Sequence, residues 1–391
     1  MSTARPEEGR VSAPWRGVAL AVLGVLTVAG FFAPADLAHD LFGPFSIVRF
    51  AIMVGFVAVC WSCRPRTDVA ESVVGAPRGA RILAIVIPAL VLVAAVIQVA
   101  WPQFAVWLVR YEIRGPNYRH AIFVKAAFEL AACVIFVILS ISFFRDLDGA
   151  RHLAGRGKRV ARGVGGSSPL DYGARRKQVW PGIVSALLAF VTLALAGEEL
   201  SWGQRIFFWA TPAGFASIND QRETNVHNMA TYLFQNTWYF GCWVLLVALP
   251  FFRLHLTALL ERTKKLRFLR DFLPPSYFVV IFAVVYGLVD PLRTAVGIRF
   301  GSILFSVVGT AAILVYLIVF ARGKMVARYL VLLAVFVAVL LIELIWSRSV
   351  TINMGVPMEY LEMFIAFGIF VWALAVWKQV HVRRAEAVGR G

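Results

Sequence analysis

The sequence predicts an all-α, polytopic integral membrane protein, and three observations support this prediction. First, 60% of the residues are hydrophobic and only 16% are charged, against about 25% charged in soluble domains. Second, apolar runs of about 20 residues, each long enough to cross the hydrocarbon layer as a helix, recur along the chain. Third, these runs lack the polar–apolar alternation of membrane β-barrel strands. Because a helix satisfies its own backbone hydrogen bonds in lipid, we expect a transmembrane helix bundle.

We predict about ten transmembrane helices, joined into a single membrane domain over residues 1–391. The predicted spans are 17–34, 45–63, 81–101, 120–144, 179–198, 232–252, 276–292, 300–320, 329–347 and 358–377. Their boundaries follow the apolar runs to within a few residues.

Basic residues are distributed unequally between the two sides that this arrangement creates. The connections on one side, with the first residue of span three, hold 29 of the 39 Lys and Arg, and those on the other side hold eight. Positively charged loops stay in the cytoplasm, so we expect both termini there, in the cytoplasmic (inner) membrane of a bacterium. Residues 145–178 are then a basic, flexible cytoplasmic loop between spans four and five, and 199–231 form an extracytoplasmic loop.

The net charge of +17 does not require a nucleic-acid partner. Basic loops next to anionic lipid headgroups account for it. We therefore expect the lipid bilayer, and no nucleic acid, as the partner of the basic surface. Nothing in the sequence specifies an oligomeric state.

The densest group of polar residues follows span five, in the predicted outer loop. It reads Gly197-Glu-Glu-Leu-Ser-Trp-Gly-Gln-Arg-Ile-Phe207 and, after an apolar stretch, Asn219-Asp-Gln-Arg-Glu-Thr-Asn-Val-His-Asn228. Ionisable groups at a membrane boundary are costly to desolvate, so they are usually functional. A partly desolvated carboxylate suits acid–base chemistry, and we predict Glu198 and Glu199 as catalytic residues. Alternatively, the two glutamates only mark the end of a span that meets water.

His227 is the third predicted catalytic residue, because imidazole transfers protons near neutral pH and binds metals. A divalent metal such as zinc, with Glu199 and His227 among its ligands, is the cofactor that these side chains would allow. The other polar residues of the motif are predicted to bind substrate. They are Ser201, Trp202, Gln204, Arg205, Asn219, Gln221, Arg222, Glu223, Asn225 and Asn228. Alternatively, Asn225 or Asn228 caps the helix of span six.

Residues 205–215, between the two halves of the motif, combine aromatic side chains with an arginine and are interrupted by Pro212 and Gly214. This composition suits the headgroup layer. A short re-entrant element here would bring Glu198 and Glu199 back toward Asn225 and His227.

Three glutamates late in the chain are predicted to support the site, since an isolated carboxylate in a membrane needs a partner. Glu343 lies in the outer third of span nine, and Glu359 and Glu362 lie three residues apart at the start of span ten. A structural salt bridge is the alternative role for each of them.

Span four contains a basic and an acidic residue in an otherwise apolar run. Lys125 and Glu129 lie four residues apart, hence on one helical face. We expect them to pair with each other or with Arg49, in a mainly structural contact.

The two halves of the motif resemble a motif in a family of bacterial polytopic membrane proteins for which no activity is implied. The chain is also distantly similar to two characterised groups. Alkaline ceramidase-like membrane hydrolases place acidic, Ser and His residues at span ends around zinc, including a pair of His residues late in the chain. This chain lacks that pair, because its last span and the flanking residues contain only His381. Polyprenyl-phosphate glycosyltransferases use an outer-face carboxylate, usually in the first outer loop, where this chain has Asp36 and Asp40.

These observations favour an integral membrane enzyme with an outer-face Glu/His/Asn site. We expect it to act as a hydrolase or transferase on a lipid or lipid-linked saccharide. A transporter is one alternative, although it would need polar groups that continue to the membrane midplane. A non-catalytic assembly partner, in which the motif packs against another protein, is the other.

Overall fold

The computed structural model describes most of the second and third quarters of the chain and the C-terminal helix. The described stretches are 118–161, 170–219, 222–227, 241–263, 265–279 and 355–388, with single positions among 78–101, 229–239, 281–285 and 311–338. All regular secondary structure in these residues is helical, which confirms the all-α prediction. Predicted spans one and two lie outside the described residues, spans three, eight and nine are described only at single positions, and span seven only at 276–279 and at single positions beyond.

Three long helices form the part of the bundle that positions the candidate site. They are α6 (Tyr118–Ala161), α7 (Leu170–Glu199) and α16 (Gly355–Val388). Each contains a segment long and apolar enough to cross a membrane: Ile122–Asp146, Val179–Glu199 and Glu362–Glu386. These segments correspond to predicted spans four, five and ten.

The remaining helical elements are short. They are η2 (Ser201–Gly203), α8 (Gln204–Phe207), α9 (Ala213–Ile218), a π-helical turn η3 (Val244–Ala248), α11 (Leu249–Phe251), α12 (Arg253–Arg262) and η4 (Arg267–Phe272). The helix over Gly241–Phe251 meets α12 at 80°. The π-turn and Pro250 both disturb the regular hydrogen bonding before this bend, so predicted span six ends in a sharp change of direction.

The segment 145–178, expected to be a flexible loop, is helical over most of its length. Helix α6 continues to Ala161 and α7 already begins at Leu170, while 162–169 lie outside the described residues. The 44 residues of α6 extend about 66 Å at 1.5 Å per residue. This exceeds the hydrocarbon thickness of about 30 Å, because polar and charged residues continue a helix beyond the apolar run that the sequence reveals.

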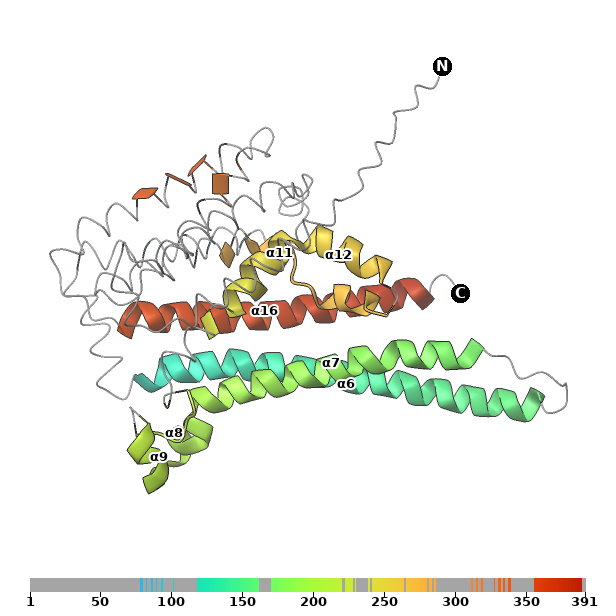
Figure 1. The fold of residues 1–391 in the computed structure, drawn as a ribbon, viewed down its shortest axis with the longest axis horizontal. Helices are drawn as coiled ribbons and strands as arrows, with labels where there is room; N and C mark the ends of the chain where they lie inside the picture. The colour runs from blue at the N-terminus through green and yellow to red at the C-terminus, as the bar shows by residue number, and fades with distance from the viewer. Residues whose placement is uncertain are drawn as a thin grey trace, which may run out of the picture.

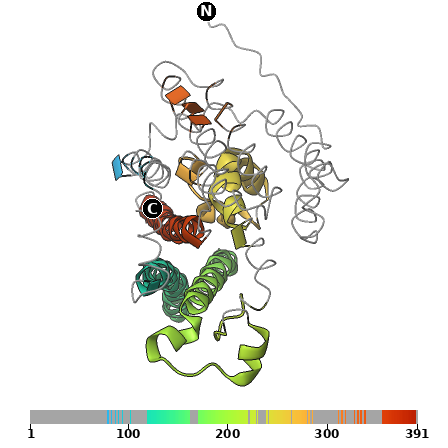
Figure 2. The same ribbon diagram turned by 90° about the vertical axis from the view of Figure 1, so that its left-hand side faces the viewer.

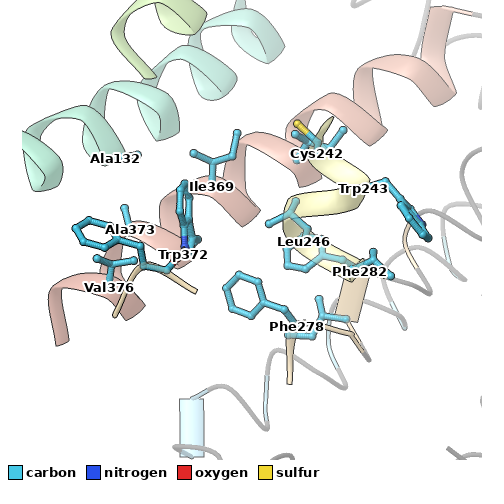
Figure 3. Close-up of a cluster of buried hydrophobic side chains, with 14 of the residues drawn as sticks. Ala132, Cys242, Trp243, Leu246, Phe278, Phe282, Ile369, Trp372, Ala373 and Val376 are labelled. Carbon is cyan, nitrogen blue, oxygen red and sulfur yellow. Dashed lines mark hydrogen bonds between the residues drawn. The ribbon is translucent and has the colours of Figure 1, made fainter. Parts of the chain in front are cut away.

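Helix α6 contacts both α7 and α16, and the three run side by side (Figures 1 and 2). The elements η3 and α11 lie against α16 on its other side (Figure 1). Aromatic and aliphatic side chains fill this region, among them Leu246 from η3, Phe282, and Trp372 from α16 (Figure 3). The indole of Trp372 donates a buried hydrogen bond of 2.8 Å to the carbonyl of Phe272, so the core is apolar without leaving this donor unsatisfied.

Helices α8 and α9 lie beyond the end of α7, outside the three-helix bundle (Figures 1 and 2). Helix α7 ends there, whereas α6 and α16 begin there. The predicted motif therefore lies at one end of the bundle, next to the first turns of two membrane-spanning segments.

Candidate functional site

The chain reverses direction immediately after α7, through three successive residues with left-handed backbone. The φ angles are 46° at Ser201, 53° at Trp202 and 95° at Gly203. Non-glycine residues avoid this region, and such strain concentrates at functional sites. The turn also explains Gly197, because a Cβ there would lie 2.9 Å from the Trp202 indole. Both glycines of the first half of the motif thus have a structural reason.

Glu198 and His227 come together across this turn. Oε2 of Glu198 lies 3.2 Å from Nδ1 of His227 and accepts hydrogen bonds from the backbone N–H of Val226 (2.7 Å) and of His227 (2.9 Å). Its Oε1 accepts a 2.6 Å hydrogen bond from the Trp202 indole. A carboxylate held by this many N–H groups is a fixed acceptor, so it orients the imidazole.

The His227 side chain is 33% exposed, and Nδ1 is the ring nitrogen that faces the carboxylate. Because an ionised carboxylate only accepts hydrogen bonds, Nδ1 is the donor, and in the neutral form of the imidazole Nε2 keeps its lone pair. This arrangement resembles the base and orienting carboxylate of a catalytic triad in its geometry.

Several residues predicted to bind substrate bond to one another. Oε2 of Glu223 accepts from Ser201 Oγ (2.9 Å), Arg205 Nη2 (2.7 Å) and Asn225 Nδ2 (2.9 Å). Ser201 and Asn225 are almost completely buried. These bonds tie the two halves of the motif together, and substrate binding by these residues stays a prediction.

A second set of bonds extends this network along the loop. The Asn219 amide donates to the backbone carbonyl of Asn225 (2.7 Å) and to its side-chain oxygen (2.9 Å). Gln204 accepts from the backbone N–H of Thr224 (2.8 Å) and donates to Thr211 (2.6 Å). Asn225 therefore joins the two halves of the motif. We call these eight residues the motif network: Ser201, Gln204, Arg205, Thr211, Asn219, Glu223, Thr224 and Asn225.

Glu199 points elsewhere and belongs to a different group of charges. Its Oε2 lies 2.8 Å from Nζ of Lys125 on α6, and the same ammonium lies 2.7 Å from Oε2 of Glu362 on α16. Tyr239 donates a hydrogen bond of 2.5 Å to the other oxygen of Glu362. Glu129, one turn along α6 from Lys125, is also buried. We call Lys125, Glu129, Tyr239, Glu199 and Glu362 the Lys125 cluster.

The predicted metal pair of Glu199 and His227 is divided between these two groups. Glu199 contacts the Lys125 ammonium, which competes with a divalent cation for the carboxylate, whereas His227 contacts Glu198. In the described part of the chain, no group of three or more His, Cys, Asp or Glu side chains could hold a metal ion. The geometry of these residues therefore gives zinc no particular support.

The other predicted residues are placed as follows. Trp202 is half exposed, and Arg222 is exposed with a φ of 55°. Glu359 belongs to α16, whereas Gln221, Asn228 and Glu343 lie outside the described residues.

Three contributors were not predicted from the sequence. Thr211 and Thr224 appeared as ordinary loop residues and Tyr239 as part of an apolar run. Only the position of Thr224 inside the second half of the motif was a signal that could have drawn attention to it.

The last residue of α8 and the two residues that follow it present an apolar surface next to the site. Phe207, Phe208 and Trp209 are 69%, 64% and 44% exposed, and the rings of Phe207 and Trp209 stack with centroids 5.5 Å apart. Exposed aromatic rings beside a membrane-spanning helix suit the headgroup layer.

The fold and the site define an all-helical protein with at least three helices long and apolar enough to cross a membrane, and a polar site at one end of them. Comparison with protein-family models, with curated proteins and with solved structures gives no match. The functional conclusion therefore depends on the site geometry.

Proposed function

We propose that this protein is a membrane enzyme, a hydrolase or transferase that acts on a lipid or lipid-linked saccharide, with His227 as its general base. The contact between His227 and Glu198 is the observation that carries the proposal. It presents a partly exposed imidazole, oriented by a fixed carboxylate, beside a membrane-spanning helix. Glu198 is a positioning residue in this scheme, and Glu199 is a structural partner of Lys125.

The chemistry needs one proton acceptor and one nucleophile. Nε2 of His227 takes the proton from a water molecule or an acceptor hydroxyl as its oxygen attacks the electrophilic centre of the substrate. The imidazolium then returns this proton to the leaving oxygen, and the Glu198 carboxylate stabilises the intermediate cation. Such a base contributes roughly 100- to 10,000-fold to a rate.

The surroundings of the pair support a lipid as the substrate class. The exposed rings of Phe207, Phe208 and Trp209 lie close to it in the chain. At the headgroup layer they would hold the loop where ester, phosphoester and glycosidic bonds of lipids occur.

The proposal includes a topology of about ten spans in a bacterial inner membrane, with both termini in the cytoplasm and the motif outside. The unequal distribution of Lys and Arg supports it. A cysteine replacing Ser217, which is exposed on α9, should react with a membrane-impermeant maleimide in intact spheroplasts. Labelling only after the membrane is broken would overturn this topology.

The enzymatic proposal is tested with purified protein and two defined probes. These are vesicles of phosphatidylethanolamine and phosphatidylglycerol, and vesicles that also contain a polyprenyl-phosphate-linked sugar, with products identified by mass spectrometry. His227→Gln should reduce turnover by roughly 100-fold or more. Glu198→Gln should reduce it less and move the acid limb of the pH–rate profile to lower pH, because the imidazolium loses its counter-charge.

Glu261→Gln is the matched control, since this carboxylate is 47% exposed and pairs with Arg270 on a different part of the molecule. It should keep the wild-type rate. Full turnover in His227→Gln would contradict the proposed role of His227. Absence of turnover in wild-type protein on both probes would favour a non-catalytic assembly partner or a transporter.

A transporter is the second candidate, and the Lys125 cluster is the observation that favours it. Charged groups buried between membrane helices mark ion and proton pathways. This candidate predicts substrate-dependent proton or ion movement across proteoliposomes, which the enzyme does not require.

A further inference from the structure

The Lys125 cluster brings together groups from three helices and one further segment. The ammonium of Lys125 on α6 bridges Glu199 at the end of α7 and Glu362 at the start of the α16 span. The Tyr239 hydroxyl donates to Glu362. Glu199 and Glu362 are separated from Lys125 by 74 and 237 residues in the sequence, so only the fold unites them.

Glu129 differs from the other two carboxyl groups of the cluster. Its side chain is almost completely buried, at 3% exposure, and its Oε2 has no hydrogen-bond partner in the described part of the chain. Glu199 and Glu362 are each only partly buried and contact the ammonium directly. An ionised carboxylate in the position of Glu129 would leave a buried negative oxygen unsatisfied, which proteins avoid.

The charges around Glu129 make an additional anion unfavourable. Lys125 on its own helix is basic, but Glu199 on α7 and Glu362 on α16 are both acidic. Cys242 is close enough to interact electrostatically with Glu129, and His227 is close enough to interact with Glu362. Among the described residues of the cluster, one ammonium therefore faces three carboxyl groups, two of which it already contacts.

We propose that the Lys125 cluster is a proton-binding site within the membrane-spanning bundle, and that Glu129 carries the proton. Protonation adds one proton from solvent to a carboxylate oxygen and forms a neutral carboxylic acid. Two carboxylates then share the Lys125 ammonium. The site does not depend on the proposed enzymatic function, because its argument uses neither a substrate nor the base His227.

The test is infrared spectroscopy of the purified full-length protein at neutral pH, with the spectrum of Glu129→Gln subtracted from that of the wild type. A protonated carboxylic acid has a carbonyl stretching band that is separate from the carboxylate bands. Wild-type protein should show this band at neutral pH, and Glu129→Gln should lose it. Glu261→Gln, which removes an exposed carboxylate, should retain it.

Thermal unfolding in detergent gives a second, independent measurement. Gln has the shape of a neutral carboxylic acid, so Glu129→Gln should unfold at the wild-type temperature. Glu199→Gln removes a direct partner of Lys125 and should unfold at a lower temperature. No band in wild-type protein, its persistence in Glu129→Gln, or failure of Glu129→Gln to fold would each overturn the proposal.

A metal cation is the competing occupant, and the same samples distinguish it from a proton. Sodium or potassium would replace the proton, so wild-type protein would unfold at a higher temperature when either ion replaces choline in the buffer. The Glu129→Gln variant would lose that difference. With a proton as the ligand, the unfolding temperature should be the same in all three buffers.

Discussion

The two ends of the three-helix bundle have opposite ratios of basic to acidic side chains. At the end where α7 finishes, one lysine serves several carboxyl groups in the Lys125 cluster. At the other end, arginines outnumber their carboxylate partners. We call this second group the arginine cluster: Arg253, Arg383 and Arg384 with Asp146 and Asp271.

One pair of the arginine cluster, Arg384 with Asp146, also differs from the Lys125 cluster in exposure. Arg384 lies 3.2 Å from Asp146, donates to Ser142 (3.0 Å) and covers the ring of Phe143 at 4.4 Å. The side chains of Arg384 and Asp146 are 30% and 44% exposed. Arg253 donates to the carbonyl of Pro274 (2.7 Å) and to Gln379 (2.8 Å), so it joins neighbouring segments.

Because of this difference in exposure, ion pairs of similar geometry should contribute differently to the stability of one bundle. An exposed pair can exchange its partner for water, so its loss costs little. A buried lysine shared by carboxylates has no such substitute. The partners of Lys125 should therefore contribute more to stability than the exposed pair of Arg384 and Asp146.

The largest expected effect follows from removing the central cation. Lys125→Met leaves Glu199 and Glu362 beside each other without their shared ammonium, and the stability should fall by about 3–5 kcal/mol. The measurement is denaturant unfolding in detergent followed by tryptophan fluorescence. Lys265→Met, at an exposed position, is the control and should behave as wild type. If Lys125→Met is as stable as wild type, the buried ammonium does not contribute more to stability than an exposed cation.

The motif network should show the next largest effect, because the buried Asn225 amide in it is neutral and bonds to several other polar groups. Asn225→Ala removes a side-chain partner of Glu223, Ser201 and Asn219, and the expected loss is about 1–3 kcal/mol. Ser217→Ala, which removes only an exposed hydroxyl bond to the Gly214 carbonyl, should change the stability little. If the two variants unfold alike, the network does not hold the loop.

The class of the fold and three of the spans could be predicted because the information is local. Apolar runs of sufficient length predicted the spans now seen within α6, α7 and α16. The extensions of α6 and α7 into 145–178 could not be predicted in this way, because a charged helix beyond the membrane has no apolar run. The count of ten spans and the sidedness stay predictions.

The site was predictable in its location but not in its contacts. Adjacent residues on a helix point about 100° apart, and Glu198 and Glu199 do face different partners. Which of them meets His227 is decided by the left-handed turn at Ser201–Gly203, which the sequence does not specify. The helical-face rule likewise identified Glu129 near Lys125, but it could not find Glu199 or Glu362, which lie on other helices.

The left-handed turn at Ser201–Gly203 directs Glu198 to His227 and leaves Glu199 with Lys125. Changing this turn therefore tests whether the motif and the Lys125 cluster are independent. Gly203→Ala places a Cβ at a φ of 95° and 3.0 Å from the Trp209 ring, at an expected cost of about 1–2 kcal/mol. Gly214→Ala, where a Cβ meets nothing within 4 Å, is the matched control. Because the Lys125 cluster does not involve this loop, the Gly203→Ala protein should keep the carboxylic-acid band of Glu129 while losing turnover.

The smallest expected effect lies at the arginine cluster. Arg384→Met removes the partly exposed contact with Asp146 but keeps an apolar side chain over Phe143, so the stability should fall by less than about 1 kcal/mol. Salt separates the two ends further. Ions screen exposed pairs more than buried ones, so the deficit of Arg384→Met should shrink at high salt while that of Lys125→Met persists. If Arg384→Met is instead as damaging as Lys125→Met at every salt concentration, burial does not set the energetic weight of these pairs. Lys125 and Arg384 would then contribute equally to the stability of the bundle.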